Sequence, residues 1–305
     1  MSTYPTKQST ITIPSDASTL PMTLPRIVEH YRRGDKLVMV TAYDYPSARA
    51  AEAAGVDLVL VGDSGAMTVL GYDSTVPVSI EELIMLAKAV RRGLTSPFLV
   101  ADLPFGSYEV SDEQAIKTAM RFVKEAGADA VKLEGCGPMA IQRARAITQA
   151  GIPVMGHVGL TPQTAVMLGG YRAQAKDASA AMSLIHGAEA LEDAGCFSVV
   201  LEAIPSVVAE AVVSRLNVPT IGIGAGPSTA GQVLVFHDLL GIREGRGGKF
   251  VQRYADLQDA MDQGVAAYAH DVRTKAYPGP EHEYAMDAAE VAALQSAIDE
   301  LPARL

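Results

Sequence analysis

Eight short runs of apolar residues recur along the chain, and segments with helical spacing of apolar positions separate most of them. Within each run almost every position is apolar, so the alternation expected of a half-exposed strand is missing. This pattern is typical of strands in a parallel sheet whose two faces are both covered. The runs cover residues 37–42, 57–61, 97–101, 130–133, 152–155, 197–201, 219–223 and 233–236.

The segments between the runs carry signals for the start and the end of helices. Ser79 and Glu82 form a predicted capping box, and Ser111 repeats the start signal. Gly93 and Gly127 are the corresponding stop signals. An Ala-Gly pair also precedes several runs, which indicates that one strand–helix unit is repeated.

Eight such units over about 250 residues predict an α/β fold of the (β/α)₈ TIM-barrel type. A doubly wound sheet is the alternative, but the first turn lacks the glycine-rich phosphate-binding sequence of that fold. We expect one catalytic barrel domain over residues 24–275, a flexible N-terminal arm over residues 1–23 and a C-terminal extension over residues 276–305. Helical spacing predicts helices over residues 250–273 and 285–301, which could close the barrel or pack on a neighbouring subunit.

The composition narrows the range of partners. The 305 residues include 25 Lys and Arg against 35 Asp and Glu, which gives a net charge of −10. Such an acidic chain is a poor match for nucleic acid or an anionic membrane surface. No apolar run approaches the roughly 18 residues that span a bilayer. The N-terminus does not read as a secretory signal, and Cys136 and Cys196 are too few for a disulfide framework, so a cytoplasmic location is expected.

Ionisable residues follow nearly every predicted strand. In a barrel the chemistry lies at the carboxyl ends of the strands. A single acid there could simply cap the next helix, but five or six around one rim are harder to explain in this way. Lys132 and Glu134 are two residues apart on a strand and so project to the same face, where a buried ion pair is the structural alternative. The strand-end residues are Asp44, Asp63, Ser64, Asp102, Lys132, Glu134, His157, Glu202, His237 and Asp238.

Asp63, Asp102 and Glu134 follow the second, third and fourth strands. Hard oxygen ligands from adjacent strands suit Mg²⁺, and a divalent ion would relieve the repulsion among them. His157 is either a core histidine or a hydrogen-bonding group for substrate. Glu202 lies in an apolar segment that would suit a general base, with a helix cap as the structural alternative. Spacing does not decide which of these two residues takes a proton.

Six motifs follow one another in an order found in one enzyme family. They are TAYDY at residues 41–45, VGDS at 61–64, ADLPF at 101–105, VKLEG at 131–135, GHVGLTPQ at 156–163 and LEAIP at 201–205. In these motifs the chain resembles the ketopantoate hydroxymethyltransferases, and the resemblance extends from about residue 24 to residue 282. It departs from the family pattern at residues 171–176, at Cys136 and in the tail beyond Tyr284.

The resemblance implies a Mg²⁺-dependent barrel that transfers a hydroxymethyl group from 5,10-methylenetetrahydrofolate to 3-methyl-2-oxobutanoate. The product would be 2-dehydropantoate, on the route to pantothenate. The family forms cytoplasmic homo-oligomers, commonly decamers. By matching position, Asp63 and Asp102 would hold the metal, with Glu134 in or just outside its shell. Asp63, Ser64, Asp102, Lys132 and His157 would bind the keto acid, and Glu202 would accept the proton with Lys132 and His157 as further catalytic residues.

Two other functions remain open at this point. A Mg²⁺-dependent carbon–carbon lyase acting on 2-oxo acids, of the isocitrate lyase and phosphoenolpyruvate mutase type, shares the Gly-Asp-Ser turn. Those lyases carry a reactive cysteine loop, which the surroundings of Cys136 and Cys196 do not resemble. A barrel that serves only as a binding scaffold is the second alternative, but such a protein would be free to lose its strand-end acids.

Overall fold

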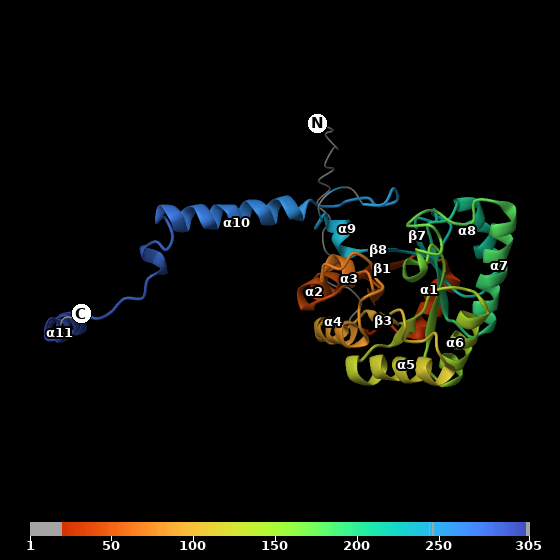
Figure 1. The fold of residues 1–305 in the computed structure, drawn as a ribbon, viewed down its shortest axis with the longest axis horizontal. Coiled ribbons are helices and arrows are strands. Elements are labelled where there is room, and N and C mark those ends of the chain that lie inside the picture. Colours follow the sequence, from red (N-terminus) through yellow and green to blue (C-terminus); the bar gives the residue numbers. More distant parts are fainter. Residues whose placement is uncertain (1–19, 244, 246, 303–305) are drawn as a thin grey trace, which may run out of the picture. The chain divides into compact units, whose positions relative to one another are not determined.

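Eight parallel strands close into a barrel in the order in which they follow along the chain, from β1 to β8 (Figure 1). The closure is made by β1, whose Met39 is in register with Leu58 of β2 on one side and with Val233 of β8 on the other. The predicted (β/α)₈ architecture is therefore confirmed. The strands are β1 (Leu37–Thr41), β2 (Leu58–Val61), β3 (Phe98–Asp102), β4 (Ala130–Lys132), β5 (Val154–Gly159), β6 (Ser198–Glu202), β7 (Thr220–Ile223) and β8 (Gly231–Leu234).

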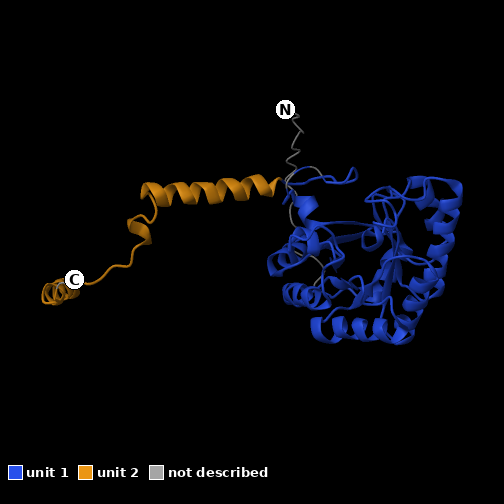
Figure 2. Ribbon diagram, in the orientation of Figure 1, with its two compact units in different colours: residues 1–255 blue, residues 256–305 orange. Residues whose placement is uncertain are grey.

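The computed structural model describes residues 20–243, 245 and 247–302. Its contacts divide the chain into a unit that ends at Ala255 and a second unit that begins at Asp256 (Figure 2). The predicted flexible arm over residues 1–23 lies almost entirely outside the described residues. In the described part of the chain, no helix has the length and apolar character needed to cross a membrane.

Helices lie around the outside of the strands, and successive helices contact one another from α4 to α8 (Figure 1). In the first unit they are α1 (Leu24–Arg33), α2 (Tyr45–Ala54), α3 (Gly65–Thr68), α4 (Ile80–Gly93), α5 (Asp112–Ala126), α6 (Pro138–Gln149), the 3₁₀ helix η1 (Pro162–Thr164), α7 (Ala178–Asp193), α8 (Ser206–Val213) and α9 (Phe236–Leu240). The second unit contains α10 (Leu257–Thr274), the 3₁₀ helix η2 (Pro280–His282) and α11 (Ala288–Asp299).

Three of the four predicted helix signals are found where the sequence placed them, whereas Gly93 is the last residue of α4 and Leu94 is its C-cap. Ser79 and Glu82 form a reciprocal capping box at the start of α4. Ser111 accepts a hydrogen bond from the backbone N–H of Gln114 at the start of α5. Gly127 ends α5 with a φ of 69°, a left-handed conformation that glycine adopts readily.

The core has two layers, which explains why the strands lack alternation. One layer fills the barrel interior, and Ile27 of α1 packs into it beside residues such as Met39, Phe98 and Met155. The other layer lies between the strands and the helices and includes Val59. Because both faces of each strand are covered by apolar side chains, an alternating polar face has no place.

The structure corrects two predicted elements. The last strand begins at Gly231, earlier than predicted, and Phe236 opens α9 instead of ending the strand. The helix predicted from residue 250 begins at Leu257. Tyr254 precedes it because its backbone N–H bonds to the carbonyl of Leu239 at 2.8 Å, which ties this segment to the end of α9.

Candidate active site

Six ionisable side chains at the carboxyl ends of β2 to β6 form one buried cluster. Five of them are at most 5% exposed, and Glu202 keeps 15% of its side chain exposed. Parallel strands end on the same rim of a barrel, so residues far apart in sequence meet there. The cluster, called the rim cluster below, consists of Asp63, Asp102, Lys132, Glu134, His157 and Glu202.

The ammonium group of Lys132 lies between two carboxylates. Its Nζ is 2.8 Å from Oδ1 of Asp102 and 3.9 Å from Oε1 of Glu134. Burial lowers the pKa of Lys132, but the charges of Asp102 and Glu134 outweigh burial and the net shift is upward. Burial raises the pKa of Asp102, and Lys132 offsets part of that rise. Lys132 therefore remains a cation within the rim cluster.

The imidazole of His157 connects two carboxylates of the rim cluster. Its Nε2 is 3.1 Å from Oε2 of Glu202, and its Nδ1 is 3.4 Å from Oε1 of Glu134. Burial and the nearby charge of Lys132 lower the pKa of His157, but its hydrogen bonds to Glu134 and Glu202 raise it to about 9. Nδ1 also lies 3.2 Å from Nζ of Lys132, from which it can accept a hydrogen bond when the ring is neutral. The raised pKa favours the protonated ring, in which both nitrogens carry a hydrogen. In that state His157 cannot accept a proton.

Glu134 already has partners for both of its carboxylate oxygens. Burial raises the pKa of Glu134, but the hydrogen bond and charge of His157, with the charge of Lys132, lower it further, so the net shift is downward. Its Oε2 accepts a hydrogen bond from the backbone N–H of Gln163 at 3.0 Å. Glu134 is thus stabilised as a carboxylate without a metal ion.

Asp63 and Asp102 have the surroundings that a divalent cation would favour. Burial raises the pKa of Asp63 well above its ordinary value, and the charges of Glu134 and Asp102 raise it further. A cation bound by Asp63 and Asp102 would remove that repulsion. Within residues 20–243, 245 and 247–302, no three His, Cys, Asp or Glu side chains are arranged as a ready-made metal site. The ligand set of Asp63 and Asp102, with Glu134 in or just outside the shell, stays a prediction.

Two polar residues that the sequence analysis did not select contact the predicted site residues. Gln163, which ends the GHVGLTPQ motif, donates a hydrogen bond from Nε2 to Oδ2 of Asp63 at 2.9 Å. Tyr43, in the TAYDY motif, has its hydroxyl 2.7 Å from Oγ of Ser64. Both residues are neutral, so a search for ionisable groups overlooked them, although both motifs were recognised.

Two strand-end acids have only structural roles. Asp44 caps α2 by accepting a hydrogen bond from the backbone N–H of Ser47 at 2.7 Å. Asp238 lies in α9 and pairs with Arg243 at 2.6 Å. For these two residues the helix-cap and surface-pair explanations are sufficient.

Glu202 differs in its setting from the sequence-based expectation. It does not cap α8, which begins after Pro205 without a side-chain cap. Its surroundings are not apolar, because the protonated ring of His157 contacts it. Gly159 allows β5 to approach this position, since a Cβ there would lie only 2.1 Å from the backbone oxygen of Glu202. The residue is therefore a partly exposed carboxylate at the edge of the rim cluster.

A family model described as ketopantoate hydroxymethyltransferase matches residues 21–280. The chain belongs to the ketopantoate hydroxymethyltransferase family. It is 53% identical over 253 residues to 3-methyl-2-oxobutanoate hydroxymethyltransferase of Deinococcus radiodurans, and this match covers 83% of this chain and 89% of the relative. The enzyme of the same name from Thermus thermophilus is 51% identical over 85% of this chain and 99% of its own length. A mitochondrial 3-methyl-2-oxobutanoate hydroxymethyltransferase from Arabidopsis thaliana is 48% identical, and the match covers 88% of this chain and 80% of the relative.

Solved structures with the same fold are more distant in sequence. Phosphoenolpyruvate phosphomutase from Streptomyces platensis subsp. rosaceus superposes with a TM-score of 0.59 at 17% identity, covering 92% of this chain and 96% of that one. A phosphonopyruvate hydrolase complexed with oxalate and Mg²⁺ superposes with a TM-score of 0.58 at 14% identity, covering 91% and 96%. At these identities the likeness concerns the barrel fold.

The segment that departs from the family pattern, residues 171–176, lies close to the rim cluster. Burial raises the pKa of Tyr171, and the charges of Asp63, Glu134 and Glu202 raise it further. The Tyr171 hydroxyl is 3.8 Å from Sδ of Met67 in α3. The departure therefore falls on a loop that borders the site rather than on the rim cluster itself.

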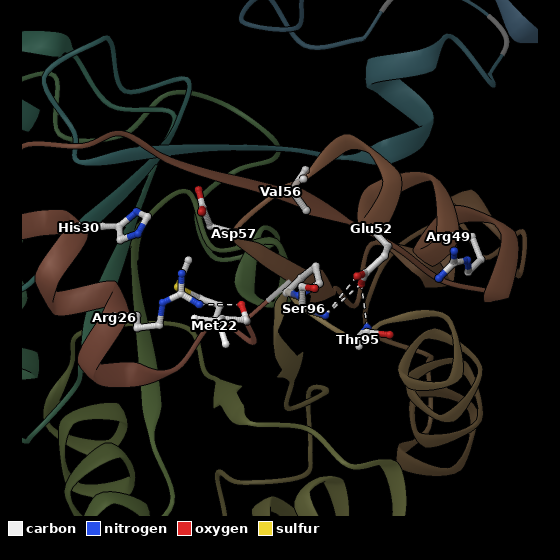
Figure 3. Close-up of a pocket in the computed structure, with 12 residues that line it drawn as sticks. Met22, Arg26, His30, Arg49, Glu52, Val56, Asp57, Thr95 and Ser96 are labelled. Carbon is white, nitrogen blue, oxygen red and sulfur yellow. Dashed lines mark hydrogen bonds between the residues drawn. The ribbon is translucent and has the colours of Figure 1, made fainter. Parts of the chain in front are cut away.

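A cavity of about 430 Å³ lies at the opposite end of the barrel (Figure 3). It surrounds the N-terminal ends of β2 and β3, where Asp57, Ser96 and Pro97 precede the strands. The acids here bind backbone amides: Glu52 accepts from the N–H groups of Thr95 and Ser96. This cavity contains no residue of the rim cluster, so it is not the candidate active site.

Proposed function

We propose that this chain transfers a hydroxymethyl group from 5,10-methylenetetrahydrofolate to 3-methyl-2-oxobutanoate and so forms 2-dehydropantoate. The observation that carries the proposal is the rim cluster, in which a buried cation, a protonated imidazole and four carboxylates meet where a barrel enzyme binds substrate. Membership of the ketopantoate hydroxymethyltransferase family supports the same reaction.

Asp63 and Asp102 are the proposed metal ligands, and Mg²⁺ is the proposed ion. Mg²⁺ is usually bound through one or two carboxylates and takes its remaining ligands from water and substrate. When bound, it would polarise the keto group of a 2-oxo acid and make the neighbouring C3–H bond more acidic. Glu134 is proposed to lie outside the metal shell, where it holds His157.

Glu202 is the proposed proton acceptor. The pKa of His157 is raised to about 9, which disfavours it as the base at neutral pH, whereas Glu202 is the most exposed carboxylate of the rim cluster. His157 positions it through the 3.1 Å contact between Nε2 and Oε2. This division of roles chooses between the two bases that the sequence left open.

Lys132, His157 and Ser64 are proposed to bind the keto acid. Lys132 places a positive charge where negative charge develops on the keto oxygen as C3 loses its proton. Ser64 can donate to the substrate carboxylate, because the Tyr43 hydroxyl holds its Oγ at 2.7 Å. Burial raises the pKa of Tyr43 to about 12, so this hydroxyl keeps its proton.

The carbon nucleophile formed at C3 would attack the methylene carbon of the folate as one of its two bonds to nitrogen breaks. Water would then replace the second nitrogen on that carbon, and the two nitrogens would take up the proton from C3 and one from water. Water supplies the hydroxyl group, so the keto acid, the methylene folate and water give 2-dehydropantoate and tetrahydrofolate.

A homo-oligomer, commonly a decamer in this family, and a cytoplasmic location remain parts of the proposal. Support for self-association comes from α10, which presents an apolar stripe to solvent. Its members recur every three or four residues along one face of the helix. They are Leu257, Met261, Val265, Tyr268 and Val272, each at least 37% exposed.

The cysteines do not favour the lyase alternative. Burial raises the pKa of the Cys136 thiol, and it raises that of Cys196 to about 12. A reactive cysteine needs a lowered pKa and an electropositive setting. Neither thiol is therefore suited to carry a catalytic step.

Product analysis tests the proposal. The full chain is incubated with Mg²⁺, 3-methyl-2-oxobutanoate and methylenetetrahydrofolate, and the products are followed by mass spectrometry. We expect 2-dehydropantoate to accumulate with tetrahydrofolate in equal amounts, and only when both substrates are present. Cleavage of a 2-oxo-acid carbon–carbon bond without folate would instead establish the lyase function.

A further inference from the structure

Gln163 is a buried neutral residue whose amide is fully engaged in the candidate site. The side chain is 4% exposed. Its Nε2 donates to Oδ2 of Asp63 and to the carbonyl oxygen of Leu103, both at 2.9 Å. Its Oε1 accepts from the hydroxyl of Tyr108 at 2.7 Å. Both N–H groups and the carbonyl of the amide thus have partners.

These partners allow only one orientation of the amide. The carboxylate of Asp63 and the carbonyl of Leu103 can only accept hydrogen bonds, so Nε2 must face them. Tyr108 supplies the hydrogen that Oε1 needs. Rotating the amide by 180° would place Oε1 against two acceptors. The Asp63 carboxylate is therefore held in one position by a group that cannot turn.

The backbone of the same residue is also fixed. Its N–H donates to Oε2 of Glu134 at 3.0 Å. The surrounding turn η1 is closed by the N–H of Thr164, which donates to the carbonyl of Thr161 at 3.0 Å. Gln163 thus connects the ends of β2 and β4 and the loop after β3 from a turn that follows β5.

We propose that Gln163 is a positioning residue that holds the Asp63 carboxylate in the orientation needed to bind the metal ion. Tyr108 acts through Gln163 by fixing its amide. The proposal rests on the proposed function, because it assigns Asp63 to the metal. Because protein groups occupy the amide of Gln163, the residue acts through Asp63.

Gln163→Met tests this proposal, because it removes the amide and keeps a side chain of similar length. Mn²⁺ is the probe, and its binding to the full chain is measured by electron paramagnetic resonance without substrate. We expect the Mn²⁺ dissociation constant to rise roughly 10- to 100-fold, as for the loss of an outer partner of a ligand. The Mg²⁺ concentration for half-maximal C3 proton exchange should rise similarly, while the rate at saturating Mg²⁺ falls much less.

Tyr108→Phe is the second variant, and Gln174→Met is the matched control. Tyr108→Phe should weaken Mn²⁺ binding by a smaller factor, and it should have no further effect in the Gln163→Met background. Gln174 lies on the same loop, and within the described part of the chain its Nε2 donates to the Arg172 carbonyl at 2.9 Å and to no residue of the rim cluster, so its replacement should leave Mn²⁺ binding unchanged.

Three outcomes would overturn the proposal. One is a folded Gln163→Met variant that binds Mn²⁺ as the unmodified chain does. Another is that Tyr108→Phe reduces Mn²⁺ affinity by the same factor in the unmodified chain and in the Gln163→Met background. If Gln163→Met does not fold, unchanged Mn²⁺ binding by Tyr108→Phe would also overturn the proposal. An unmodified chain that neither binds Mn²⁺ nor exchanges the C3 proton would instead refute the proposed function, and this proposal with it.

Discussion

The two ends of the barrel both carry acidic residues, but these residues have different partners. At the N-terminal end, Glu52 accepts from backbone amides, and Asp57 accepts from the N–H of Val38 at 2.8 Å. At the carboxyl end, Asp102 also accepts from the backbone N–H of Asp63 at 2.9 Å, but both acids lie next to the charged groups of Lys132 and Glu134. Burial raises the pKa of Asp57 as well, so the difference lies in the neighbouring charges: Glu134 raises the pKa values of Asp63 and Asp102. Acids that accept hydrogen bonds from backbone amides stabilise the fold. Acids buried beside other charged groups repel one another, and a bound ligand or cation can relieve this repulsion.

Glu202→Gln, at the carboxyl end of the barrel, is expected to reduce the rate of C3 proton exchange more than any other change discussed below. The substitution keeps the shape of the side chain and the contact with His157 but removes the basic oxygen. We expect the rate of C3 proton loss to fall by about 10²- to 10⁴-fold, the usual contribution of a general base. Proton exchange followed by NMR measures this rate, and keto-acid binding followed by calorimetry should change little. Weaker keto-acid binding together with a normal exchange rate at saturating keto acid would show that Glu202 is a binding residue.

Lys132→Met removes the cation between Asp102 and Glu134. The rate of exchange should fall by about 10²- to 10³-fold, because charge on the keto oxygen is no longer stabilised. The two carboxylates would also lose their counter-charge, so the free energy of unfolding should decrease by roughly 3–5 kcal/mol. Chemical denaturation measures the second effect. A stable variant that keeps the normal rate would contradict the role of Lys132.

Asp102→Asn tests the metal assignment at the same end. Since Asp102 is proposed as a direct ligand, Mg²⁺ affinity should fall by at least the 10- to 100-fold that loss of an outer partner produces. Titration of exchange activity with Mg²⁺ measures the change. The same variant of Glu134, Glu134→Gln, is the comparison, and it should affect Mg²⁺ affinity less. An equal loss of Mg²⁺ affinity in both variants would show that Glu134 is a metal ligand as well.

Glu52→Gln is the matching change at the N-terminal end, and its expected effect is the smallest. Burial raises the pKa of Glu52, but the backbone amides of Thr95 and Ser96 lower it more, so the net shift is downward. The stabilisation is therefore present above the ordinary pKa of 4.5 and is lost as the pH falls through the folded value. Since the carboxylate is partly exposed, we expect a loss below about 1 kcal/mol near pH 7.

Denaturation of both proteins across pH 3 to 7 checks this prediction. The difference in unfolding free energy should shrink as the pH falls, and the exchange rate at pH 7 should not change. A variant with normal stability but altered exchange would mean that the two ends are coupled.

The architecture followed from the sequence because strands covered on both faces leave continuous apolar runs, and strand ends leave ionisable groups next to them. Asp63, Lys132 and His157 could be selected in this way. Asp44 and Asp238 could not be set apart from them, because cap formation depends on the backbone conformation that follows the strand.

Other features left weaker signals. Helix α1 has Pro25 in its first turn and ends at Gly34, a combination that could have indicated it. Gln163 carries no charge, and its role depends on partners from the end of β2, the loop after β3 and the end of β4. The contacts that Glu134 makes with His157 and the backbone of Gln163 are set by side-chain packing that sequence spacing does not encode.

Deuterium exchange at C3 of 3-methyl-2-oxobutanoate, in heavy water with Mg²⁺ and without folate, tests the central claim most directly. The account predicts exchange that requires Mg²⁺, that does not require the folate, and that Glu202→Gln slows by about 10²- to 10⁴-fold. A chain that forms no C3-deuterated keto acid under these conditions, while Mg²⁺ and the keto acid are shown to bind, would contradict it.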